Sequence, residues 1–220
     1  MTAAAPTNTF TITAAPGTDI WRKPPATDVF NAPTASPPGS STRTSGPLNS
    51  FLSARLSLRF TWREQYDQGG ILLSFRRTSK SSSSSGGGGG GSDDDDTPPP
   101  KWIKAGIEFY NGAPRLSTVA CDAWADWSVA PLQQEEKGVG WTTVLVEKAG
   151  DHHGTSLWVY QVMGATGEKV PLREVCWVFG DRPEEWEVEV EAMAARPGKG
   201  VPEGEGLVVE FRDMEVNWSA

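Results

Sequence analysis

The sequence predicts one all-β domain, a sandwich of mostly antiparallel strands. From residue 50 onwards, apolar and polar residues alternate with a period of two, and helical periodicity is not evident. The alternating stretches are short and are bounded by Gly, Pro, Asp or Asn, which is typical of sandwiches and barrels. A chain of 220 residues with ten Trp and eight Phe has enough large apolar side chains for one such core.

The first elements are short. We expect a strand at residues 9–13, followed by a segment over residues 14–49 that is rich in Pro, Ser, Thr and Gly. This segment predicts extended, irregular chain that packs on the domain through Ile20, Trp21 and Phe30.

The main strands follow from the alternation. A long strand over residues 50–62 places Leu56, Leu58 and Phe60 on one face. Asn111-Gly112 is a strong hairpin signal, and residues 149–154 predict a second hairpin turn. Further strands are predicted at 70–76, 102–110, 115–121, 140–148, 155–163, 172–179, 186–194 and 206–218.

Residues 78–100 differ from the rest of the single domain that we predict over residues 1–220. They contain runs of Ser, Gly, Asp and Pro that cannot bury apolar area. We therefore expect a disordered low-complexity insertion at a hairpin tip, where added length costs little closure entropy.

Composition excludes several classes of function. A net charge of −8 argues against binding to nucleic acid or to an anionic membrane surface, both of which need clustered Lys and Arg. No apolar run approaches the ~20 residues of a membrane span, and residues 1–10 do not resemble a signal peptide. The two cysteines, Cys121 and Cys176, are expected to be buried and reduced, so we predict a cytoplasmic protein.

The strand at 102–110 has two distinct faces. Ile103, Ala105, Ile107 and Phe109 form an apolar row that predicts core, and the other row is Trp102, Lys104, Gly106, Glu108 and Tyr110. Lys104 and Glu108 are four residues apart, about 13 Å along a strand. Each charge therefore needs water, a ligand or a cross-strand partner, for which Arg55 and Arg59 are candidates.

Several segments resemble, in order, a known family. They are YDQGGIL at 66–72, KWIKAGIE at 101–108, LSTV at 116–119, DWS at 126–128, AARP at 194–197 and the closing strand through Phe211. The sequence resembles the regulation-of-enolase family of concanavalin A-like proteins, and residues 10–33 resemble its fungal members. The resemblance implies a concanavalin A-like jelly roll of two packed antiparallel sheets, a fold class that contains lectins and glucanases. It also implies a role in regulating enolase.

The polar and aromatic row of strand 102–110, with the family elements, predicts a non-catalytic binding module. Aromatic faces cover the apolar patches of sugars and charged groups hold their hydroxyls, so we expect a carbohydrate or sugar-phosphate-like ligand on the concave sheet face. No catalytic residue, cofactor or metal is predicted. The predicted ligand-binding residues are Trp102, Lys104, Glu108, Asp67, Gln68, Asp126 and Trp127.

Alternatives remain open for this site and for the whole protein. Asp67 and Asp126 could cap turns through backbone N–H groups, and the face of strand 102–110 could be structural. The chain could instead act as a protein-interaction regulator of a metabolic enzyme, with enolase as the implied partner.

A third alternative is a glycoside hydrolase that uses Glu187, Glu189 or Glu191. Retaining hydrolysis needs carboxyl groups roughly 5–5.5 Å apart, whereas the outer pair of this strand is separated by about 13 Å. The only histidines, His152 and His153, lie in a predicted turn, which disfavours a catalytic triad or a metal site built on them.

Overall fold

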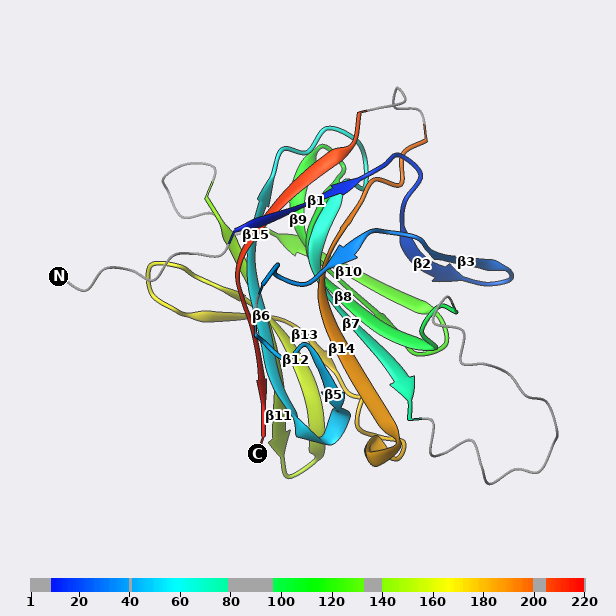
Figure 1. The fold of residues 1–220 in the computed structure, drawn as a ribbon, viewed down its shortest axis with the longest axis vertical. Helices are drawn as coiled ribbons and strands as arrows, with labels where there is room; N and C mark the ends of the chain where they lie inside the picture. Colours follow the sequence, from blue (N-terminus) through cyan, green and yellow to red (C-terminus); the bar gives the residue numbers. More distant parts are fainter. Residues whose placement is uncertain (1–8, 40, 79–96, 133–139, 200–204, 220) are drawn as a thin grey trace.

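Two antiparallel sheets pack face to face in the computed structural model (Figure 1), which describes residues 9–39, 41–78, 97–132, 140–199 and 205–219. The predicted fold class, an all-β sandwich of antiparallel sheets, is confirmed. Helical structure in the described residues is limited to two short 3-10 turns, Leu48–Ser50 and Pro183–Glu185. Among these residues no helix is long and apolar enough to cross a membrane.

One sheet has six strands. Along the sheet, their order is β1 (Phe10–Ala14), β15 (Leu207–Trp218), β6 (Phe51–Phe60), β11 (Thr142–Asp151), β12 (Gly154–Val162) and β13 (Lys169–Val175).

The other sheet has seven strands and carries the face predicted to bind a ligand. Along this sheet, the order is β10 (Ala125–Pro131), β9 (Ala113–Cys121), β8 (Lys101–Tyr110), β7 (Gln68–Arg77), β14 (Trp186–Ala195) and β4 (Thr34–Ala35), and β5 (Ser45–Pro47) also pairs with β14.

Alternation along the strands builds the core between the two sheets. Ile103, Ala105 and Ile107 of β8 point into it with Leu56 and Leu58 of β6, as the sequence predicts. Phe109 is only half-buried and stacks on Trp62 at the edge of the core.

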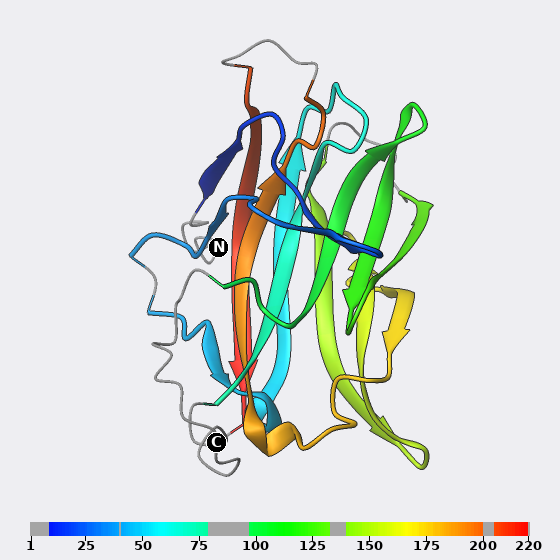
Figure 2. The same ribbon diagram turned by 90° about the vertical axis from the view of Figure 1, so that its right-hand side faces the viewer.

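A hairpin that the sequence did not predict covers the outer face of the seven-stranded sheet. Strands β2 (Ile20–Lys23) and β3 (Thr27–Phe30) are too short to show a period of two, and Figure 2 shows this blue hairpin crossing in front of the green strands. Ile20, Trp21 and Phe30 pack there, as predicted, in a second apolar cluster. The cluster also contains Leu72, Trp102, Val119, Cys121, Met193 and Ala195.

The hairpin predicted at Asn111-Gly112 is present between β8 and β9. Both residues have positive φ, 51° and 74°, which is the backbone of a type I′ turn. The strand predicted at 172–179 instead runs from Lys169 to Val175. Cys176 follows this strand and is exposed, so the expectation of two buried thiols is wrong for Cys176 and correct for Cys121.

The segment predicted as an insertion, residues 78–100, connects β7 to β8, and these two strands are paired neighbours. Most of it, residues 79–96, lies outside the described residues. The chain that follows is held in place, because Arg76 donates to the carbonyl of Thr97 at 2.6 Å and Arg22 donates to that of Pro100 at 2.8 Å.

Candidate functional site

A cavity of about 370 Å³ lies between the β2–β3 hairpin and the outer face of the seven-stranded sheet. Its volume is within the range of small-molecule sites, which is roughly 300–1,000 Å³. Four of the seven predicted residues line it, namely Gln68, Lys104, Glu108 and Trp127. The other lining residues are Asp19, Trp21, Lys23, Tyr66 and Val119.

The strand register explains why the four predicted residues meet. Gln68 lies directly across the β7–β8 ladder from Glu108, and Val119 of β9 lies between Lys104 of β8 and Trp127 of β10. Directly paired residues point to the same face of a sheet. These side chains therefore all point away from the core and towards the hairpin.

Glu108 is a buried carboxylate with two donors on one oxygen. Its Oε2 accepts from the hydroxyl of Ser117 at 2.6 Å and from the indole N–H of Trp127 at 3.1 Å. The residue is 5% exposed, and this burial raises the pKa of Glu108 although the two hydrogen bonds and the charge of Lys104 oppose the rise.

Lys104 links the sheet to the hairpin. Its Nζ donates to Oε1 of Gln68 at 2.8 Å and lies 3.3 Å from Oδ1 of Asp19, which also accepts from the backbone N–H of Ile20. Lys104 is 6% exposed, so the ammonium group has left water and depends on these partners.

Two paired glycines give Lys104 the space to reach Gln68. Gly70 and Gly106 face each other across the ladder, between the pair Leu72–Lys104 and the pair Gln68–Glu108. A Cβ atom on Gly106 would lie 2.0 Å from the carbonyl oxygen of Gly69, so only glycine fits. With no side chain between them, the head groups of Lys104 and Glu108 can meet at one cavity.

Aromatic rings form the walls of the cavity. Trp127 packs edge-on against Trp21 and Tyr66, with ring centroids 6.5 and 6.4 Å apart, and against Tyr110 at 4.9 Å. Tyr66 stacks on Tyr110. The loop that carries Tyr66 is tied to the end of β8, because the backbone N–H of Tyr66 donates to the carbonyl of Phe109 at 2.7 Å.

Asp67 is placed away from this cavity and has a structural role, as the turn-capping alternative proposes. It is fully buried and forms two hydrogen bonds with Arg196, both of 2.8 Å. Its Oδ2 also accepts the backbone N–H groups of Arg63 and Glu64 at 2.9 and 3.0 Å. Its carboxylate is therefore engaged by protein groups.

Asp126 and Trp102 also do not line the cavity. Asp126 precedes Trp127 on β10, so its side chain points to the opposite face, where it pairs with Arg173 of β13. Trp102 shares the face of Lys104 but is 1% exposed, within the apolar cluster under the hairpin.

The remaining sequence candidates lie elsewhere. Glu187, Glu189 and Glu191 project from the outer face of β14, and none of them lines the cavity. His152 and His153 occupy the exposed β11–β12 turn. The suggested partners of Lys104 and Glu108, Arg55 and Arg59, belong to the other sheet and pair with Glu215 and Glu210. The described residues contain no group of three His, Cys, Asp or Glu side chains that could hold a metal ion.

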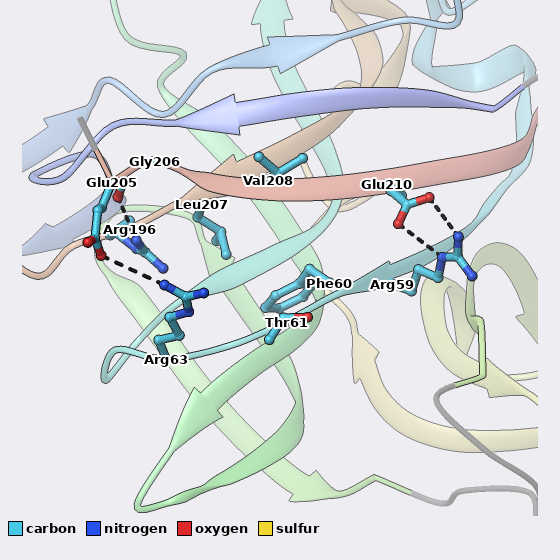
Figure 3. Close-up of a pocket in the computed structure, with 10 residues that line it drawn as sticks. All are labelled: Arg59, Phe60, Thr61, Arg63, Arg196, Glu205, Gly206, Leu207, Val208 and Glu210. Atoms are coloured by element: carbon cyan, nitrogen blue, oxygen red, sulfur yellow. Dashed lines mark hydrogen bonds and ion pairs between the residues drawn. The ribbon is translucent and has the colours of Figure 1, made fainter.

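A second hollow, of about 530 Å³, lies beside β6 and β15 (Figure 3). Its charged side chains face one another in pairs: Arg59 with Glu210, and Arg63 with Glu205 at 3.8 Å. Arg196 reaches its edge and donates to the carbonyl of Glu205 at 2.6 Å. None of the predicted ligand-binding residues lines this hollow.

Sequence reasoning missed the contribution of the hairpin. Asp19 and Trp21 contact the site from a segment that is 85 residues from Lys104 in the chain. The sequence predicted that Trp21 packs on the domain, and the only further signal for the two residues was the family resemblance, which includes residues 10–33.

The chain is similar in sequence and in structure to proteins of unknown function. The family model described as "Protein of unknown function (DUF1349)" matches residues 2–218. An uncharacterized protein of Emericella nidulans is 38% identical over 207 residues, which are 93% of this chain and 84% of that protein. The crystal structure of a functionally unknown protein from Saccharomyces cerevisiae superposes with a TM-score of 0.57 at 18% identity, covering 97% of this chain and 89% of that one, which shows a shared fold.

Proposed function

This chain belongs to the DUF1349 family of proteins of unknown function, and we propose from its cavity that it is a non-catalytic binding module for a carbohydrate or sugar-phosphate-like ligand. The observation that carries the proposal is that a buried carboxylate and a buried ammonium group, Glu108 and Lys104, line one aromatic-walled cavity. Buried charges are costly, so their position at a cavity favours use in recognition.

The proposed ligand follows from the mixture of groups. Rings such as Trp21 and Trp127 suit the C–H faces of a sugar, and Glu108, Lys104 and Gln68 suit its hydroxyls. Asp19 is the other carboxylate of the cavity, and its Oδ1 is bonded to Lys104 and to the backbone of Ile20.

Calorimetry with mono- and disaccharides and with sugar phosphates tests this proposal. We expect binding by the wild type and at least about a tenfold loss, or roughly 1.4 kcal/mol, for Glu108→Ala and for Trp127→Ala. Glu189→Ala is the matched control, because Glu189 is exposed on the same sheet face outside the cavity. Equal affinity of both cavity variants and the wild type would rule out this site.

We propose a protein-interaction role as the second candidate, with enolase as the partner that the resemblance implies. It is supported by β10, which is the edge strand of its sheet in the described residues. Val129 on this strand is 38% exposed, and Trp124 just before it is 48% exposed. Exposed apolar side chains at a sheet edge favour contact with another chain. A pull-down with purified enolase tests it. Retention by the wild type and loss by Trp124→Ser are expected, and no retention by the wild type would exclude it. A cytoplasmic location, which such a role needs, is tested by microscopy of a tagged chain.

A further inference from the structure

Glu108 keeps one oxygen for a ligand. The hydrogen bonds from Ser117 and Trp127 both end on Oε2. Within the described ranges, no hydrogen bond reaches Oε1, and this atom is not among the buried polar atoms that lack a partner. Oε1 is therefore an acceptor that remains open at the cavity, held in position by the two bonds to its neighbour.

The ammonium group of Lys104 keeps one N–H donor for a ligand. An ammonium group has three N–H bonds, and Lys104 directs two of them to Gln68 and Asp19. Across the described part of the chain, no third acceptor contacts Nζ. The rings of Trp21 and Trp102 each lie 5.9 Å from it and cannot replace an oxygen acceptor.

The open acceptor and the open donor line the same cavity, and the charge of Lys104 acts on the carboxylate of Glu108. Gln68 lies directly opposite Glu108, and Nζ of Lys104 is 2.8 Å from the amide oxygen of this same Gln68. Residues opposite each other in a ladder have Cβ atoms about 4.5–5.5 Å apart. The ammonium group thus reaches the level of Glu108 on the sheet, although its own Cα atom is four residues away.

The geometry points to recognition of a vicinal diol of a neutral sugar, in which one hydroxyl donates to Oε1 of Glu108 and its neighbour accepts from Nζ of Lys104. This inference rests on the proposed function and narrows its ligand class. A vicinal diol offers a donor and an acceptor on adjacent carbons, which matches an adjacent carboxylate and ammonium. The ring faces of Trp21 and Trp127 are then available for the C–H groups of the same sugar.

The charges of the cavity favour binding of neutral sugars over binding of sugar phosphates. The inner cation, Lys104, is already paired with Asp19, and Glu108 adds a second negative charge to the cavity. A phosphate or carboxylate at the diol position would meet Glu108 with little screening, because the site is largely out of water. The remaining cation, Lys23, is exposed at the cavity's hairpin side.

The test compares neutral sugars with their charged counterparts by calorimetry. The probes are glucose, galactose, mannose, xylose and cellobiose, the 6-phosphates of glucose and mannose, glucuronate, and 2-deoxyglucose as a probe that lacks one hydroxyl. We expect at least one neutral sugar to bind, and its phosphate or uronate to bind at least about tenfold more weakly. Glu108→Gln should weaken the neutral sugar by at least about tenfold, and Glu189→Gln should leave it unchanged.

Each of the other outcomes would refute a defined part of the diol inference or of the proposed function. Tighter binding of sugar phosphates than of neutral sugars, with loss in Lys23→Met, would refute the diol inference and leave the binding module standing. Equal affinity of Glu108→Gln and the wild type for a neutral sugar would refute the contact to Glu108. No binding of any probe to the folded wild type would refute both the diol inference and the proposed carbohydrate function.

Discussion

The ammonium group of Lys104 lies 2.8 Å from the amide oxygen of Gln68, the residue that faces Glu108 across the β7–β8 ladder. The two charges of β8 are therefore not bonded to each other along their own strand. Each is held by a neighbouring strand, and the glycine pair between them lets both reach one cavity. The predictions below test this arrangement and the contacts that support it.

Gly106 should be intolerant of any side chain. In Gly106→Ala the new methyl group would lie 2.0 Å from the carbonyl oxygen of Gly69 and 2.5 Å from Cα of Gly70, and backbone cannot move aside as a side chain can. We expect a loss of about 1–3 kcal/mol in the free energy of unfolding, measured in urea. Gly150→Ala is the control, since its Cβ would have no atom closer than 3.6 Å. Equal losses in both variants would contradict the close approach of β7 and β8.

Glu108 should make stability depend on pH. Its pKa is raised mainly by burial, so the folded state binds more protons than the unfolded state between the ordinary glutamate value and the folded value. The free energy of unfolding should then fall as pH rises through this interval, and below it Glu108 should contribute no dependence.

Glu108→Gln removes this titration. We expect its Tm to rise relative to that of the wild type as pH increases from about 4 to about 8, the range that begins near the ordinary glutamate pKa. Differential scanning fluorimetry measures the difference at each pH. Glu189→Gln, on the same face but exposed, is the control for the loss of one glutamate charge. A constant difference for Glu108→Gln would contradict the raised pKa.

Arg196 should be essential for stability. It is the partner of Asp67, and removal of one member of a buried ion pair leaves an uncompensated charge, which costs about 3–5 kcal/mol. We expect Arg196→Met to lose this amount in urea unfolding. Arg55→Met should lose at most about 1 kcal/mol, because the pair of Arg55 with Glu215 is exposed. Similar losses in the two variants would show that the Asp67–Arg196 contact is not a main support of the fold.

The two thiols should differ in reactivity. Cys121 is buried and its pKa is raised by that burial, whereas Cys176 is exposed after β13. Because the thiolate is the reactive form, Ellman's reagent should titrate one thiol per native chain quickly and the second one only in urea. Cys176→Ser should remove the fast phase. Rapid reaction of both thiols in the native protein would contradict the packing of Cys121 under the hairpin.

Local pattern was enough to predict most of the sandwich. A period of two assigns the residues of a strand to its two faces without any knowledge of neighbours, so the core row Ile103 to Ile107 and the turn at Asn111-Gly112 could be identified directly. The same rule placed Lys104, Glu108 and Trp102 on one outer face. It could not show that the hairpin buries Trp102 and leaves a cavity over Lys104 and Glu108.

The two aspartates show the limit of spacing arguments. Asp67 and Gln68 are adjacent, yet Gln68 lines the cavity and Asp67 turns to Arg196, a residue that follows it by 129 positions. Likewise, Asp126 pairs with Arg173, whereas the adjacent Trp127 lines the cavity. In both pairs the sequence located the segment, and the choice of face depended on strands distant in the chain.

The sequence by itself determined the all-β sandwich, its strand faces and the residues from which a site could be built, because these follow from chain periodicity and turn chemistry. Tertiary structure alone decided which of these residues meet, because the β7–β8 glycine pair and the covering hairpin act between segments far apart in the chain. The reason is that burial and desolvation depend on what packs above a residue. Lys104 and Glu108 became neighbours at one cavity only when Gln68, Ser117, Trp127 and Asp19 were brought around them.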